Sequence, residues 1–236
     1  MMFVPWWAVL SSACAPFLLV GGWSIAAELH GPGYDPVTET ISVMAAYGAS
    51  GRWVLTGVLF VLGLCHLVTA WGLRPAALAG RAALACGGVA VIGMGLSPVP
   101  ESGGSEVHGW VAAVGFALMA LWPVLASDRD GAAPWGLRPA LSLAVCLLMG
   151  LGAAWFLIEL HRQGGAAGVA ERVLTTAQTA WPFVVVASCR GRAALRTDEL
   201  DERDGRGGRG GTGGPDGTDE AGERDAMDDT YRTDWP

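Results

Sequence analysis

Histidines and carboxylates are the side chains of this sequence that could bind a metal or transfer protons near neutral pH. His30, His108 and His161 lie in or beside polar connections that also carry aspartate and glutamate. Such a set could hold a transition metal or perform acid–base catalysis. No two histidines show the HxH, HxxxH or HExxH spacing of metal-binding motifs. We therefore predict no metal and no bound cofactor, and acid–base chemistry at His108 stays open as an alternative.

The longest polar interval, residues 31–53, contains a helix signature. Asp35-Pro36 is typical of an N-cap followed by proline at the first helical position, and Gly48 is typical of the residue after a helix C-terminus. The apolar residues between them recur at helical spacing. The interval therefore predicts a short amphipathic helix over residues 36–47, lying on the outer mouth of a helical bundle.

A second polar group, Glu171 and Arg172, precedes the last apolar segment. Glutamate in a first helical turn complements the helix dipole, and Arg172 could pair with Asp35 or Glu39, or hold a lipid phosphate. The simpler interpretation makes Asp35 only a cap and Arg172 only half of a structural ion pair. The candidate outer-pocket residues are Asp35, Glu39, Ser42, His108, Glu171 and Arg172.

His66 is an ionisable residue well inside an apolar segment, where such residues are functional candidates. At about 1.5 Å per helical residue, it lies roughly 20 Å below Trp53 and the outer interface. This depth predicts a position in the cytoplasmic half, outside any site made by the outer loops. We expect a neutral imidazole that is hydrogen-bonded to a neighbouring helix.

The composition indicates a membrane protein. Hydrophobic residues make up 52% of the 236 residues and charged residues only 16%. More than half of the charged residues lie from position 190 onward, and the others, apart from Glu159 near the end of one apolar segment, fall between the segments. A soluble core could not cover so much apolar surface with so few charges, whereas a bilayer could.

Six apolar segments approach the ~17–25 residues that span a bilayer. They are residues 5–27, 53–73, 82–97, 109–126, 139–160 and 173–188. We predict an all-α polytopic membrane protein, with six transmembrane helices in a bundle over residues 1–189. A disordered, charged cytoplasmic tail is predicted over residues 190–236. Small residues at helical spacing predict that the third and fifth spans pack centrally.

The arginines predict the orientation. They occupy the second and fourth connections and begin the tail, whereas the first and third connections carry mainly acidic residues. The positive-inside rule then places both termini in the cytoplasm. We expect the protein in the plasma membrane. The sequence has no basic face, which argues against nucleic-acid binding. Five cysteines in or beside apolar segments are expected to act as small hydrophobic residues.

Three short blocks of sequence resemble a known family. They are GYDPVTETISVMAAYG, GLSPVPESGGSEVHGWVAAVGFAL and GVAERV. Their arrangement, over about residues 5–188, resembles the prokaryotic membrane family catalogued as domain of unknown function 998. That family is distantly similar to the six-helix membrane proteins of the Frag1, DRAM and Sfk1 type. The resemblance implies the six-helix topology. It does not indicate which molecular activity the protein has. The positions matched to its motifs are Asp35, Ser42, Pro98, Pro100, His108, Glu171 and Arg172.

Three classes of function follow. The first is a non-enzymatic membrane protein that binds a lipid or other amphiphile at an outward-facing polar pocket. The second is a membrane-embedded enzyme that uses outer acids and His108 on a lipid or isoprenoid-like substrate. A transporter is the least favoured class, because ion-coupled carriers usually bury charges near the midplane. Membrane lipids are the expected partners, and the sequence indicates no protein partner.

Overall fold

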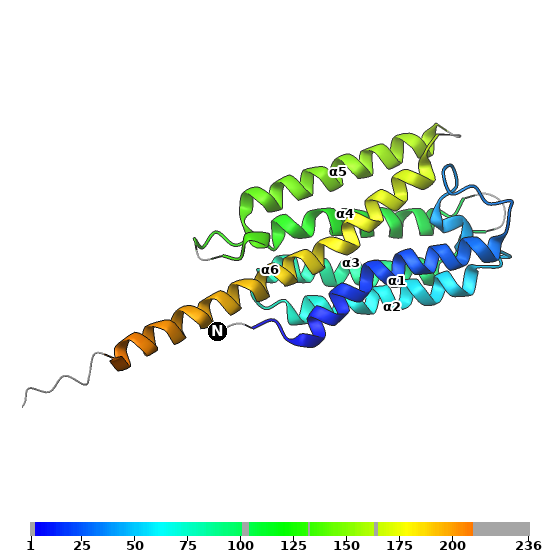
Figure 1. Ribbon diagram of the computed structural model, residues 1–236. Coiled ribbons are helices and arrows are strands. Elements are labelled where there is room, and N and C mark those ends of the chain that lie inside the picture. Colours follow the sequence, from blue (N-terminus) through cyan, green and yellow to red (C-terminus); the bar gives the residue numbers. More distant parts are fainter. Residues whose placement is uncertain (1–2, 101–103, 132, 163–164, 210–236) are drawn as a thin grey trace, which may run out of the picture. The chain divides into compact units, whose positions relative to one another are not determined.

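The computed structural model describes residues 3–100, 104–131, 133–162 and 165–209, with side chains to Leu195. These residues contain no strand and form six α-helices and two short 3-10 helices (Figure 1). The elements are α1 (Trp6–His30), η1 (Ile41–Ala45), α2 (Arg52–Gly72), α3 (Leu78–Leu96), α4 (Glu106–Leu125), η2 (Trp135–Leu137), α5 (Pro139–His161) and α6 (Ala167–Arg209). The predicted all-α class is confirmed, and the first five apolar segments coincide with α1 to α5 to within a few residues. Helix α6 begins before the sixth segment, 173–188, and extends well beyond it.

Helices α1 to α5 are each long and apolar enough to cross a membrane. Their outer surface is apolar as well: Phe17, Trp53, Leu78, Trp110 and Leu151 are each more than two-thirds exposed. A soluble monomer rarely exposes apolar surface on this scale, whereas acyl chains would cover it. The helices therefore indicate a membrane-embedded protein. That α6 is a sixth span stays a prediction.

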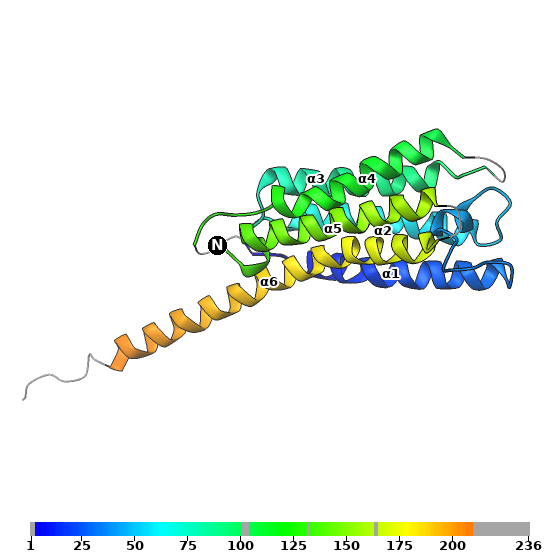
Figure 2. The same ribbon diagram turned by 90° about the horizontal axis from the view of Figure 1, so that it is seen from above.

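Consecutive helices α1 to α4 run antiparallel and pack as neighbours (Figures 1 and 2). Glycines let the backbones of α2 and α3 approach closely. A Cβ added to Gly63 would lie 2.5 Å from the Gly88 carbonyl oxygen, and one at Gly88 would lie 2.7 Å from that of Gly63. Helix α3 therefore packs closely against α2, and it also lies beside α4.

The predicted central position of α5 is wrong. No atom lies within 4 Å of a Cβ added at Gly150, and the neighbouring Leu147, Leu148 and Leu151 are exposed. The small residues of α5 therefore do not mark a close helix contact. They lie on a peripheral helix whose leucines form part of the apolar surface.

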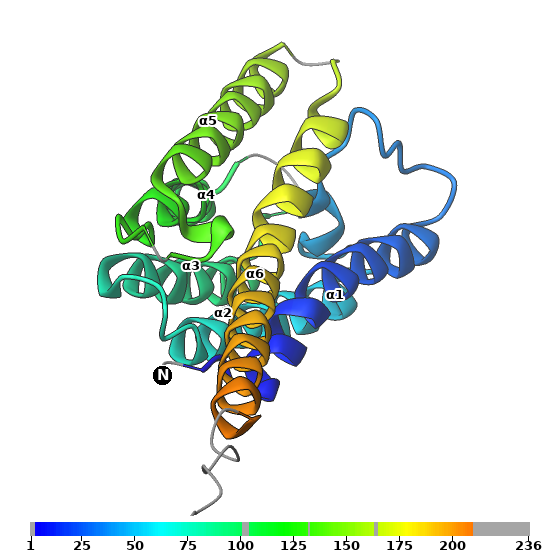
Figure 3. The same cartoon turned by 60° about the vertical axis from the view of Figure 1, so that its left-hand side comes forward.

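Helix α6 lies against both ends of the bundle (Figure 3). Near its start, Ala170 and Leu174 pack with Met149 and Phe156 of α5. Farther along, Val185 packs in a cluster that includes residues of α1, α2, α3 and α4. The helix continues to Arg209, so the first part of the predicted tail is helical. Positions 210–236 of that tail lie outside the described residues.

The predicted amphipathic helix over residues 36–47 is replaced by a turn and the short η1. In an α-helix the Ile41 N–H would donate to the Val37 carbonyl. Here the Val37 carbonyl accepts from the N–H groups of Gly168 and Val169, at 3.0 and 3.2 Å, and the Ile41 N–H donates to the Glu171 carboxylate. The start of α6 thus takes the bonds that would continue the helix.

Candidate functional site

The segment between α1 and α2, residues 31–51, is called the first connection below. Its Asp35 begins a single capped turn. The Asp35 carboxylate accepts from the Val37 N–H at 3.0 Å and from the Thr38 hydroxyl at 2.9 Å, while the Glu39 carboxylate accepts from the Asp35 N–H at 2.9 Å. These hydrogen bonds, that from Val37 first, lower the pKa of the exposed Asp35 carboxyl. Asp35 and Glu39 therefore act as local caps, as the simpler interpretation expected for Asp35.

Arg172 of α6 fastens the first connection to the bundle. Its Nη1 donates to the main-chain carbonyls of Pro36, Glu39 and Gly168, at 2.9, 3.2 and 2.8 Å. Its Nη2 donates to the Tyr34 hydroxyl, and the guanidinium carbon lies 5.7 Å from the ring centroids of Trp23 and Tyr34. The predicted ion pair with Asp35 or Glu39 is not formed among the described residues. Arg172 meets the main chain of Glu39, not its carboxylate.

Gly168 is required where this contact is tightest. A Cβ there would lie 2.3 Å from the Glu39 carbonyl oxygen and 2.5 Å from that of Pro36. Such distances do not occur for real Cβ atoms, so only glycine lets the first turn of α6 reach the carbonyls of the first connection.

Glu171, the residue before Arg172, is buried. Its carboxylate accepts the Ile41 N–H at 2.5 Å. Glu171 lies two residues before the apolar segment 173–188. Burial raises the pKa of its carboxyl to about 7, although the Ile41 N–H and the charge of Arg172 act to lower it. Glu171 is therefore poised to gain or lose a proton near neutral pH.

His108 joins the first connection to α4. Its Nδ1 lies 2.8 Å from the Ser97 carbonyl oxygen, and its Nε2 lies 3.2 Å from the Ser42 hydroxyl. A carbonyl can only accept, so a neutral His108 carries its proton on Nδ1 and accepts the Ser42 hydroxyl on Nε2. The ring is buried, and Ser105 caps α4 by accepting the His108 N–H at 3.2 Å. Its orientation is thus fixed from three sides.

Ser42, His108 and Glu171 line one internal cavity. The cavity offers about 70 Å³ to the centres of water-sized molecules, which is room for several waters. Its lining is mostly aliphatic and aromatic, with a minority of polar side chains. The polar lining residues are Ser42, His66, His108, Glu171, Thr175, Gln178 and Thr179. Asp35, Glu39 and Arg172 are not among the lining residues.

The cavity is long, because each of three helices lines it over two or more turns. Helix α2 contributes Leu55 to His66, α4 contributes His108 to Met119, and α6 contributes Glu171 to Thr179. All three helices begin at the end of the bundle that carries the first connection. At about 1.5 Å per residue, these stretches extend for roughly 12 to 16 Å.

The exclusion of His66 from this site is therefore wrong. Helix α2 is continuous from Arg52 to Gly72, so the distance counted along it from Trp53 to His66 applies, but the cavity reaches the same level. The predicted hydrogen bond to a neighbouring helix is absent at Nε2, which is buried without a partner among the described residues. His66 is 1% exposed and lines the cavity.

The polar face of α6 was missed by the sequence analysis. Thr175, Gln178 and Thr179 follow Glu171 at intervals of four, seven and eight residues, which places all of them on one helical face. That periodicity was visible in ERVLTTAQT. Gln178 Nε2 donates to the Phe116 carbonyl at 3.0 Å, so the face also bonds to α4. These polar residues reduce the apolar character of α6, which is not among the five helices described above as able to span a membrane.

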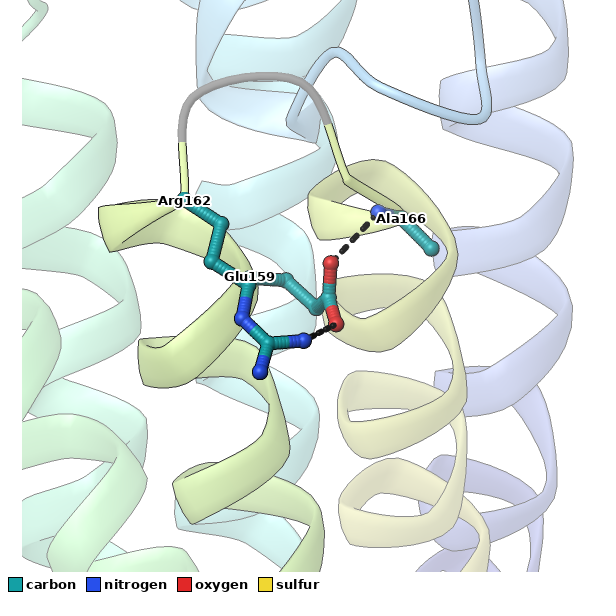
Figure 4. Close-up of polar contacts among 3 residues, drawn as sticks. All are labelled: Glu159, Arg162 and Ala166. Atoms are coloured by element: carbon teal, nitrogen blue, oxygen red, sulfur yellow. Dashed lines mark hydrogen bonds and ion pairs between the residues drawn. The ribbon is translucent and has the colours of Figure 1, made fainter.

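The remaining polar residues near the start of α6 have local roles. The Glu159 carboxylate accepts the Ala166 N–H at 2.8 Å and pairs with Arg162 at 3.7 Å (Figure 4). His161 is exposed and bonds to the Leu157 carbonyl of its own helix at 2.8 Å. In the part of the chain that the structure describes, no group of three or more histidines, cysteines and carboxylates is placed to hold a metal.

Fold and cavity together define a class: a helical, membrane-embedded protein with a narrow, partly polar cavity behind its first connection. The chain belongs to the family described as protein of unknown function (DUF998), whose model matches residues 12–188. No curated protein and no solved structure shows a significant match to the chain. The family carries no activity over to this chain, so a function must be argued from the cavity.

Proposed function

We propose that the protein binds a single-chain amphiphile in this cavity without changing it covalently. The observation that supports this function is the chemical division of the lining. The Glu171 carboxyl and the Ser42–His108 pair lie beside the first connection. From there inward, Leu55, Leu59 and other apolar residues make up most of the lining, beside the polar face of α6 and His66. A polar head at the first group and a chain along the second would satisfy both surfaces.

The dimensions favour one chain over two. A cavity that extends for roughly 12 to 16 Å along its helices, yet offers only about 70 Å³ to the centres of water-sized molecules, is narrow. It suits one alkyl or prenyl chain better than the two chains of a phospholipid. In the orientation that the arginines predict, the polar end faces outward and the ligand comes from the outer leaflet of the plasma membrane.

Access would depend on the contact between Arg172 and the first connection. Ile41, Ser42 and Ala45 line the cavity from η1, and the carbonyls of Pro36 and Glu39 hold this segment against α6 through Arg172. Release of these bonds would open the polar end. The first connection is thus proposed as the lid of the binding site.

Two adjacent threonines on α6 allow a direct test. Thr175 lines the cavity, whereas Thr176 does not. The protein would be purified from its native membrane, and its bound amphiphiles would be extracted and identified by mass spectrometry. Thr175→Leu should fill the cavity and reduce the bound amphiphile to about a tenth or less, whereas Thr176→Leu should retain it. Equal amounts in the two variants would contradict the proposal.

The Ser42–His108 pair supports a second candidate, a serine hydrolase for a lipid ester. The arrangement has a hydroxyl, a base within hydrogen-bond reach and a third group that orients the base. Ser42 Oγ would attack the ester carbonyl carbon while His108 Nε2 accepts its proton and then protonates the departing alcohol. Water would attack the acyl-serine in the second half, releasing the acid and restoring the Ser42 hydroxyl.

This candidate differs from the acid–base enzyme expected from the sequence. The ring nitrogens of His108 bond to Ser97 and Ser42, and no described carboxylate bonds to them. A fluorophosphonate probe would distinguish the two functions. Labelling that is lost in Ser42→Ala supports hydrolysis, and an unlabelled wild-type protein that still carries an amphiphile supports binding alone.

A further inference from the structure

His66 presents an unused hydrogen-bonding atom at the inner end of the cavity. The side chain is 1% exposed, lines the cavity, and its Nε2 has no partner among the described residues. Buried polar atoms of this kind are nearly always satisfied by protein, by ordered water or by a ligand. The atom therefore indicates that the cavity is completed by something other than the protein chain.

The position of His66 sets it apart from the polar end of the cavity. Along α2, Leu55, Leu59 and Leu62 precede it at intervals of eleven, seven and four residues, so the four share one lining face. The eleven residues from Leu55 to His66 correspond to about 16 Å of helix. A ligand that reaches both ends must therefore carry a polar group at each end of an apolar stretch.

We infer that the cavity selects a two-ended amphiphile, whose head lies at Ser42, His108 and Glu171 and whose distal hydroxyl bonds to His66 Nε2. This inference rests on the proposed binding function and names its ligand class. A hydroxyl is favoured over a carbonyl because it can both donate and accept. It can thus pair with Nε2 whichever ring nitrogen of His66 carries the proton.

Thr179 and Gln178 line the inner part of the same cavity, but both already form hydrogen bonds to the protein. The Thr179 hydroxyl donates to the Thr175 carbonyl at 2.9 Å, and Gln178 Nε2 donates to the Phe116 carbonyl at 3.0 Å. These bonds engage the Thr179 hydroxyl and one N–H of the Gln178 amide within the protein. Among the described residues that line the cavity, His66 Nε2 is the buried polar atom without a hydrogen-bond partner.

Two acids of the same length serve as probes: decanoic acid and 10-hydroxydecanoic acid. They differ only in the distal hydroxyl, and their chain matches the length of the cavity to about one helical turn. Binding of each acid would be measured by equilibrium dialysis with the full-length protein in phosphatidylcholine nanodiscs. Wild-type protein should bind the hydroxy acid about tenfold more tightly, since one net hydrogen bond corresponds to about a factor of ten.

Three variants connect the preference to His66. His66→Phe should bind the two acids equally, and His66→Asn should keep part of the preference. His161→Phe changes an exposed histidine outside the cavity and should leave the tenfold preference unchanged. An unchanged preference in His66→Phe would overturn the inference.

The outcomes for the wild-type protein separate this inference from the proposed function. If the wild type binds decanoic acid but shows no preference for the hydroxy acid, water satisfies His66 and only the two-ended ligand is rejected. If it binds neither acid and carries no amphiphile from its membrane, the binding function itself fails. Because these results require no substitution, they decide the question even if His66→Phe does not fold.

Discussion

Arg172 donates a hydrogen bond to the main-chain carbonyl of Pro36 at 2.9 Å, across 136 positions of the sequence. This bond joins the start of α6 to the first connection. A guanidinium can satisfy several carbonyls at once because its donors form a fixed, planar fork. Arg172 therefore helps to hold the proposed lid closed through main-chain carbonyls and not through an ion pair with an acidic side chain.

Replacement of Arg172 should loosen this contact. Arg172→Ala removes the guanidinium that donates to the carbonyls of Pro36, Glu39 and Gly168 and to the Tyr34 hydroxyl. Hydrogen bonds to charged groups contribute about 1.5–3 kcal/mol when partly buried, so we expect a loss of about 2 kcal/mol in the free energy of unfolding. Thermal unfolding measures the loss, and faster amide exchange at residues 36–45 should locate it.

Arg162→Ala provides the control, because the Arg162 side chain is 69% exposed and its guanidinium pairs with Glu159 at 3.7 Å. That pair should contribute less than about 0.5 kcal/mol. Equal effects of the two substitutions would show that Arg172 is not a specific fastening. Arg172→Lys should fall between them, since an ammonium keeps the charge but cannot present the fork.

A second prediction concerns the glycine beside Arg172. Gly168→Ala places a methyl group 2.3 Å from the Glu39 carbonyl oxygen and 2.5 Å from that of Pro36. Both obstacles are backbone, so the first connection must move, at a cost of about 1–3 kcal/mol. The matched change Gly150→Ala meets no atom within 4 Å and should be neutral or stabilise by up to about 1 kcal/mol. Equal melting temperatures for the two variants would contradict the close approach at Gly168.

These contacts separate what the sequence can predict from what it cannot. The helices α1 to α5 follow from local hydrophobicity and length, which is why their ends agree with the predicted segments. The cap at Asp35 is equally local. The conformation of residues 36–47 is decided by Gly168, Glu171 and Arg172, and no pattern within the interval records those partners.

His66 shows a related limit. Its distance from the membrane surface can be counted along α2, but the depth of a cavity depends on which residues of several helices face it. The polar repeat from Glu171 to Thr179 was the available signal, because a polar face on a helix inside an apolar bundle needs a polar or hydrated surface to contact.

The Ser42–His108 contact should stabilise the cavity. His108→Ala leaves the Ser97 carbonyl and the Ser42 hydroxyl without their shared partner. Each buried group left unsatisfied costs about 1–3 kcal/mol, so unfolding should become easier by about 2 kcal/mol. His161→Ala removes an exposed ring whose described bond, to the Leu157 carbonyl, lies within α5, and it should change the melting temperature little. If the two alanine variants have equal melting temperatures, the hydrogen bonds of His108 to Ser42 and Ser97 contribute nothing to stability.

The last prediction concerns pH. The pKa of Glu171 is raised to about 7 mainly by burial, so the folded protein holds a proton that the unfolded carboxyl, with its ordinary value of 4.5, has already lost. The contribution of neutral Glu171 is therefore fully present below about pH 4.5, falls as the pH rises, and is lost above about pH 7. Glu171→Gln keeps an acceptor for the Ile41 N–H and cannot ionise. Its melting temperature relative to wild type should therefore increase between pH 5 and 8.

Asp35→Asn should show no such trend, because the pKa of Asp35 is lowered and its contribution changes only at more acidic pH. A constant difference between wild type and Glu171→Gln over this range would mean that Glu171 is already ionised in the folded protein. The Ile41 N–H and Arg172 would then outweigh its burial.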